Sequence, residues 1–229
     1  MKSENANTIS EKLLLAVKQQ EPVNDLVNEL EHFQFTQLQE ELNTDERKKA
    51  FWINIYNAYF QILRISKNLV KPKVYKEKEI VIAGKYFSLD DIEHGILRRF
   101  RYKYSLGYLP NMFAPEFIKK LIVKTIDYRI HFALNCGAKS CPPIAFYSVD
   151  RINEQLDTAT LAFLEIDTEI DTENKKIYVT SLFKWFLKDF GGLNGIRIIL
   201  NKQLNVNTKG YKIKFKVYSW EEQLHNFSE

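Results

Sequence analysis

The stretch over residues 47–65, RKKAFWINIYNAYFQILRI, decides how the rest of this 229-residue chain is arranged. Residues 50–63 include no charged side chain, so a helix formed here is apolar around its whole circumference. A helix of this kind needs packing partners on every side, and we expect it to be the central helix of the fold. Two asparagines interrupt it, Asn54 and Asn57, which share one helix face.

These two amides need specific partners, because a buried amide without a hydrogen bond costs about 1–3 kcal/mol. One interpretation is structural: Asn54 and Asn57 fasten neighbouring loops or strand ends to the central helix. The other is functional: one of them orients a catalytic histidine or lines a pocket. The residue pattern leaves both open.

The residues before the central helix predict a separate helical segment. Residues 1–45 are mostly polar or charged, carry leucines at helical spacing and are divided into two predicted helices by Pro22. We therefore divide the chain into an N-terminal helical segment, residues 1–45, and a domain, residues 46–229. The segment is either an appended hairpin or the first layer of that domain.

The residues after the central helix alternate between short strands and helices. We predict a hairpin over 79–89 that turns at Ala83-Gly84, and a helix from 89 to 100 capped by Ser88. Further helices are predicted over 114–126, 150–165, 181–192 and 195–204, and strands over 129–135, 176–180 and 211–220. The expected fold class is α+β: one compact, mostly helical domain with a small, largely antiparallel sheet.

Composition argues against several classes of protein. Lysine and arginine number 33 and aspartate and glutamate 29, with no run of five like charges, so nucleic-acid binding is not expected. No apolar run approaches the about 18 residues of a membrane span, and the N-terminus does not resemble a signal peptide. We expect a cytoplasmic protein without membrane contact, in which the two cysteines are free thiols.

The predicted helix over residues 89–100 carries a concentrated set of ionisable side chains. His94 stands one turn after Asp90 and Asp91 and one turn before Arg98, with Glu93 beside it. A nearby acid would favour the imidazolium form of His94 and fix its ring. The set is either a solvated charged face or an acid–histidine pair that serves as a general base.

Residues 131–143, HFALNCGAKSCPP, contain both cysteines. Lys139 stands close to Cys141 in the sequence, and a nearby ammonium would lower the pKa of that thiol. A thiol nucleophile, a disulfide across the loop and buried structural cysteines are all conceivable. His131, Cys136 and Cys141, with a distant His94, do not have a standard metal-ligand spacing, so no metal site is predicted.

Five separated motifs occur in an order that resembles the DUF547 family of bacteria and plants, a family without an assigned activity. They are FWINIYNAYF, SLDDIEHGILR, RIHFALNCGAKSCPPI, SLFKWFLKDFGG and YSWEEQL, and they span roughly residues 48–220. The chain departs from the family at Tyr218-Ser219-Trp220, where relatives often have aspartate in the middle. The family pattern implies a site carried by Trp52, Asn54, Asn57, Asp91, Glu93, His94, Arg98, His131, Asn135, Cys136, Ser140, Cys141 and Pro142.

Two functions follow from these residues. In a thiol-dependent hydrolase or acyl transferase, Cys141 or Cys136 is the nucleophile, His94 or His131 the base, and Asn54 or Glu93 the orienting group. In a non-catalytic ligand- or protein-binding scaffold, the same residues form a structural polar network. Either function predicts a pocket for a small molecule or peptide, without a cofactor. Its binding residues are then Trp52, Asn57, Asp91, Arg98, Asn135 and Ser140.

Overall fold

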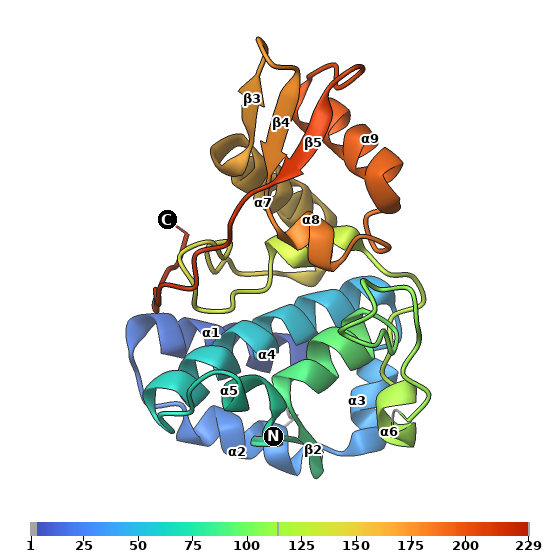
Figure 1. Ribbon diagram of the computed structural model, residues 1–229. Coiled ribbons are helices and arrows are strands. Elements are labelled where there is room, and N and C mark those ends of the chain that lie inside the picture. Colours follow the sequence, from blue (N-terminus) through green and yellow to red (C-terminus); the bar gives the residue numbers. More distant parts are fainter. Residues whose placement is uncertain (1–3, 114, 229) are drawn as a thin grey trace.

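The computed structural model describes residues 4–113 and 115–228 and has the α+β fold that the sequence predicts. Two parts are packed on each other: a helical part, blue to green in Figure 1, and a part with a three-stranded sheet, orange to red. The helical part contains α1 (Ala6–Gln19), α2 (Asn24–His32), α3 (Phe35–Glu41), α4 (Asp45–Ile65), α5 (Lys73–Lys76), α6 (Glu116–Lys119), β1 (Ile80–Ile82), β2 (Lys85–Phe87) and the π-helix η1 (Asp91–Leu97).

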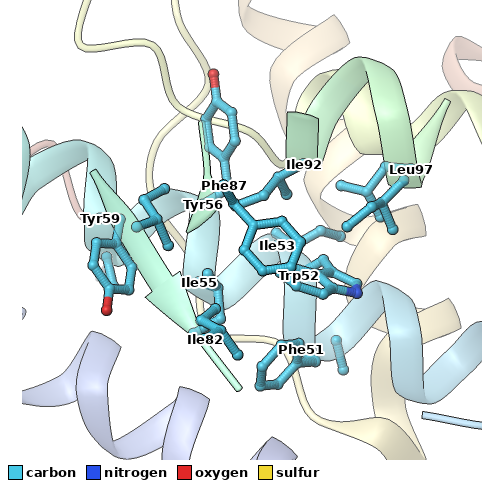
Figure 2. Packing of buried hydrophobic residues seen from close by; sticks show 14 of the residues in the cluster. Phe51, Trp52, Ile53, Ile55, Tyr56, Tyr59, Ile82, Phe87, Ile92 and Leu97 are labelled. Carbon is cyan, nitrogen blue, oxygen red and sulfur yellow. The ribbon is translucent and has the colours of Figure 1, made fainter. Parts of the chain in front are cut away.

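The central helix of the fold is α4, as predicted. Thr44 begins it, because the hydroxyl oxygen of Thr44 accepts a hydrogen bond from the Arg47 N–H at 3.3 Å. The residues in its charge-free stretch are almost all buried. Figure 2 shows Trp52 among the apolar side chains around this helix; its ring centroid lies 5.2 Å from that of Phe87.

The N-terminal helices are the first layer of the helical part and not an appended hairpin. Leu13 and Leu14 of α1 are fully buried, and they belong to the same hydrophobic cluster as Phe51 and Trp52 of α4. Leu30 of α2 and Leu38 of α3 complete this layer. The boundary drawn after residue 45 therefore separates helices that share one hydrophobic core.

The hairpin and the helix after it follow local sequence signals. Strands β1 and β2 pair antiparallel, with positive φ angles of 52° at Ala83 and 65° at Gly84, where the turn is predicted. The Ser88 hydroxyl then accepts a hydrogen bond from the Asp91 N–H at 3.0 Å, as expected of a cap. The helix that follows is the π-helix η1 and not an α-helix.

The second part contains the 3₁₀ helices η2 (Tyr128–Phe132) and η3 (Val149–Arg151), helices α7 (Ile152–Asp167), α8 (Leu182–Trp185) and α9 (Gly192–Leu204), and strands β3 (Glu169–Asp171), β4 (Lys176–Val179) and β5 (Lys212–Phe215). In the sheet order β3-β4-β5, the first pair is antiparallel and the second parallel. A second hydrophobic cluster, which includes Phe132, Phe183 and Leu200, forms the core of this part.

Several predicted elements differ in the structure; the predicted helix over residues 181–192 is limited to the four residues of α8, and the predicted strand over 211–220 to the four of β5. Residues 129–135 form most of η2 and the turn after it, where a strand was predicted, since short apolar runs have no period that separates strand from helix. Asp127 caps η2, with its carboxylate accepting the Arg129 N–H at 3.1 Å. The helix predicted over residues 114–126 is limited to the four residues of α6. In the described part of the chain, no helix has the length and apolarity to cross a membrane.

Candidate functional site

A cavity of about 570 Å³ lies between the two parts of the molecule. Its wall combines residues of α4, α5, η1 and the loop after η1 with residues of α8 and of the segment after β5. The segment between η2 and η3 contributes its two cysteines. The lining residues are Tyr56, Tyr75, Asp90, Glu93, His94, Lys103, Tyr104, Leu106, His131, Leu134, Cys136, Cys141, Pro142, Leu182, Trp185, Phe186, Tyr218 and Trp220.

The two cysteines in this wall are joined in a disulfide, which corrects the expectation of free thiols. The hydroxyl of Tyr218 lies 3.1 Å from each sulfur, and the N–H of Cys136 donates to Cys141 Sγ at 2.9 Å. Gly137 has a positive φ of 65°, so the chain can turn sharply between the cysteines. Tight packing of this turn against Phe60 and Leu224 also excludes a larger residue at Gly137.

The segment that carries the cysteines is fastened to α4 by the two asparagines of the central helix. Asn57 donates to the Ala133 carbonyl and accepts the N–H of Asn135, both at 2.9 Å. Asn54 makes the same pair of bonds to the backbone of Tyr147, at 2.7 and 3.1 Å. All four polar atoms of the two amides are therefore hydrogen-bonded. These contacts agree with the structural interpretation, in which Asn54 and Asn57 fasten neighbouring segments to the central helix.

Four side chains form a buried polar chain across the boundary between the two parts. Arg98 Nη1 donates to His94 Nδ1 at 2.9 Å, and Arg98 Nε donates to Asp189 Oδ2 at 2.5 Å. The same carboxylate oxygen accepts a hydrogen bond from His131 Nε2 at 3.0 Å. Arg98 and Asp189, in the middle of this series, have no exposed side-chain surface, whereas His94 and His131 border the cavity. The ring of His131 stacks on Phe186, with centroids 3.9 Å apart.

The hydrogen bonds determine where the protons of the two imidazoles lie. Burial lowers the pKa of His131 to about 4, so its ring is neutral at neutral pH, with the proton on the nitrogen that faces Asp189. Burial alone would raise the pKa of Asp189, but the bonds from His131 and Arg98 hold it below its ordinary value. Nδ1 of His131 therefore keeps its lone pair.

The protonation state of His94 differs from the one that the sequence predicts. Burial, followed by the positive charge of Arg98, lowers its pKa well below the ordinary value, so the expectation that neighbouring acids favour the imidazolium is wrong. Because Arg98 can only donate, His94 Nδ1 is an acceptor and its proton lies on Nε2, which is 3.7 Å from Asp90. Neither nitrogen of His94 then has a free lone pair to act as a base.

Glu93 is the buried carboxyl of the cavity. Burial raises its pKa to about 7, while Arg98 lowers it and Asp90 raises it further. Its Oε2 lies 3.5 Å from the hydroxyl of Tyr56. Figure 2 shows that hydroxyl pointing away from the apolar cluster around α4. Asp90 forms an ion pair with Lys103, whose ammonium opposes the rise in the pKa of Asp90 that burial causes.

The structure gathers only some of the sequence-predicted residues in this cavity. Cys136, Cys141, His94, His131 and Glu93, with the implied Pro142, line it. The other predicted residues lie behind or beside it, without lining it: Trp52, Asn54, Asn57, Asp91, Arg98, Asn135 and Ser140. Asn135 braces the disulfide turn, and the hydroxyl of Ser140 accepts the N–H of Ser219 at 2.9 Å.

Sequence reasoning missed several residues of the site. Asp189, the partner of His131, stands in the motif SLFKWFLKDFGG, but nothing in that motif marks it as facing a histidine 58 positions earlier. Lys103 and the aromatic residues Trp185, Tyr218 and Trp220 were also not predicted. Among the described residues, no group of three or more His, Cys, Asp and Glu side chains could hold a metal ion.

One comparison with known proteins gives a match. A family model described as "Protein of unknown function, DUF547" matches residues 39–164, which is more than half of the chain. The matched region runs from α3 into α7 and contains α4, η1 and the disulfide turn. It supports the resemblance up to residue 164, while Asp189 and Tyr218 lie beyond it. No curated protein and no solved structure matches the chain.

Proposed function

The chain belongs to the DUF547 family, for which no function is defined, and from its cavity we propose a thiol-dependent hydrolase or acyl transferase. The observation that carries the proposal is that the Cys136–Cys141 disulfide lines one cavity together with a histidine bound to a buried aspartate. The disulfide is then the oxidised resting form, and reduction releases the nucleophile.

Cys141 is the better nucleophile of the two cysteines. Its sulfur accepts a hydrogen bond from the backbone N–H of Cys136, and an N–H donor at this position stabilises a thiolate. The Tyr218 hydroxyl, 3.1 Å from the same sulfur, is a second donor. Both groups also lie where they can donate to an oxyanion that forms next to Cys141.

His131 is the better base of the two histidines. Asp189 accepts its Nε2 proton, which leaves the lone pair of Nδ1 for a substrate or thiol proton. This arrangement resembles the histidine–aspartate pair of known hydrolases in its roles only. His94 is less suited, because Arg98 occupies its Nδ1.

The reaction begins when two molecules of a small thiol reduce the disulfide, giving two protein thiols and one external disulfide. The thiol of Cys141 attacks the carbonyl carbon of an ester, thioester or amide as its proton moves to His131 Nδ1, because an imidazole whose pKa burial lowers to about 4 does not hold this proton before the attack. The leaving group departs with the proton of His131, and Cys141 holds the acyl group as a thioester. Water or a second nucleophile then takes the acyl group and restores the thiol.

The test is acyl transfer to the cysteine itself, since it needs no knowledge of the natural substrate. The protein is incubated with p-nitrophenyl acetate with and without dithiothreitol, and peptide mass spectrometry locates the acetyl group. We expect acetylation of Cys141 only after reduction, and a slower reaction in Asp189→Asn, in which the orientation of His131 is weakened. His225→Asn is the matched control, because His225 does not line the cavity.

Acetylation of surface lysines alone, or equal rates with and without reduction, would refute the proposal. Asp189→Asn could act by loosening the fold, so its melting temperature is measured beside its rate. A variant that melts like the parent and still loses the Cys141 reaction supports a role in catalysis. A reduced parent protein that does not react favours the alternative function, a non-catalytic ligand-binding scaffold.

A further inference from the structure

The cavity wall is rich in aromatic rings. Seven of its eighteen lining residues are aromatic: Tyr56, Tyr75, Tyr104, Trp185, Phe186, Tyr218 and Trp220. Three of them form a compact cluster, in which the Trp185 centroid lies 4.8 Å from Tyr218 and 5.6 Å from Trp220. The faces of such rings carry partial negative charge and attract cations, and tryptophan does so most strongly.

One ring of this cluster already has a cation near it. The ammonium of Lys71 lies 5.0 Å from the centroid of Trp220, within the range of a cation–π interaction. Lys71 Nζ is buried without a hydrogen-bond partner, and burial lowers the pKa of this lysine. The aromatic cluster therefore accommodates an ammonium group from within the chain.

The same cavity contains a carboxyl group that forms no ion pair with a lysine or arginine of the described residues, although, against the effect of burial, the positive charge of Arg98 lowers its pKa. Asp90 is paired with Lys103, the one lysine or arginine among the lining residues. Glu93 has only the neutral His94 ring at 3.6 Å and the Tyr56 hydroxyl at 3.5 Å, and no lysine or arginine of the described chain lies within ion-pair distance of it. A buried carboxylate is stable only when a positive charge or hydrogen-bond donors compensate it.

We infer that the cavity binds a substituted ammonium ion, with its charged nitrogen between the Glu93 carboxyl and the Trp185, Tyr218 and Trp220 rings. The ligand supplies the positive charge that Glu93 lacks, and the aromatic wall replaces the water that the cation gives up. Where the ammonium ion is taken as the substrate of an acyl-transfer enzyme, the inference rests on the proposed function. In that reaction an amine acts as acyl acceptor, or a cationic group anchors the acyl donor.

The test compares two probes of almost equal size, benzylamine and benzyl alcohol, by isothermal titration calorimetry at about pH 8. Benzylamine is positively charged under these conditions, and benzyl alcohol is neutral. We expect the oxidised protein to bind benzylamine about tenfold more tightly, since a cation–π contact combined with a buried carboxylate supports a preference of that order. Keeping the disulfide intact makes binding independent of thiol chemistry.

Two variants assign the preference to the residues named. Glu93→Gln should reduce the benzylamine preference several-fold, and Glu165→Gln, an exposed site on α7, should leave it unchanged. Trp220→Leu should weaken the binding of benzylamine more than the binding of benzyl alcohol. Because the ring of Trp220 is half exposed, its replacement is not expected to disturb folding. A melting curve for each variant shows that it is folded.

The inference is overturned if the two probes bind equally, if neither binds, or if Glu93→Gln keeps the preference. Its failure and that of the proposed function are distinguishable. Acetylation of Cys141 without any preference for benzylamine would refute only the inference that the cavity binds an ammonium ion. A benzylamine preference without acetylation of Cys141 would refute only the proposed thiol chemistry and would still support a cation-binding cavity.

Discussion

The substitution Glu93→Gln is expected to make the protein more stable at pH 8, although it removes a charged residue from the candidate site. Burial raises the pKa of Glu93 from its ordinary 4.5 to about 7, so the folded protein holds this proton over a pH range in which the unfolded chain releases it. The stabilisation by the protonated carboxyl is complete below pH 4.5 and is lost as pH rises through 7.

The size of the effect follows from the two pKa values. They differ by about 2.5 pH units, and each unit corresponds to about 1.36 kcal/mol, so the loss amounts to about 3 kcal/mol. Glutamine keeps the shape of the protonated carboxyl and does not ionise. The variant and the parent should therefore be similarly stable near pH 4.5, with the variant about 3 kcal/mol more stable near pH 8.

The measurement is urea unfolding of both proteins across this pH range, and the quantity of interest is the difference between their free energies of unfolding. The parent alone is uninformative, because His131 acts in the opposite direction. Its folded pKa of about 4 lies below the ordinary 6.5, so the protein gains stability as pH rises through that window. Taking the difference between variant and parent cancels the contribution of His131.

Glu165→Gln serves as the control, since Glu165 is exposed on α7 and its replacement should leave the pH dependence unchanged. A difference between parent and Glu93→Gln that stays constant from pH 4.5 to 8 would refute the reasoning. It would mean that the Glu93 carboxyl is as well solvated in the folded protein as in the unfolded chain.

Three further predictions concern stability. Asn57→Ala removes two buried hydrogen bonds and should lower the free energy of unfolding in urea by about 2–4 kcal/mol; a loss below about 1 kcal/mol would contradict this role. Gly107→Ala should lower the melting temperature, because φ is 84° there and a Cβ would lie 2.6 Å from Asp189; an unchanged melting temperature would contradict the close contact. Reduction of the Cys136–Cys141 disulfide should cost about 2 kcal/mol, since the loop is short; complete unfolding in dithiothreitol would contradict this.

The local features of the fold could be predicted from sequence because their causes are near in the chain. A run without charge marks α4 as buried, the Ala83-Gly84 pair marks a turn, and Ser88 marks the start of a helix. Each depends on residues within a few positions of one another. The same reasoning failed over residues 129–135, where a short apolar run fits either a strand or a helix.

The arrangement of the candidate site depended on contacts between distant residues. Sequence alone identified His131, Cys141 and Glu93 as functional candidates by residue type and by family resemblance. Tertiary structure joined the cysteines, placed Asp189 against His131 and brought Glu93 into one cavity wall with aromatic rings from both parts of the chain. Local preferences act through neighbouring backbone, whereas partners, burial and hence pKa values arise only when the two parts pack around a shared cavity.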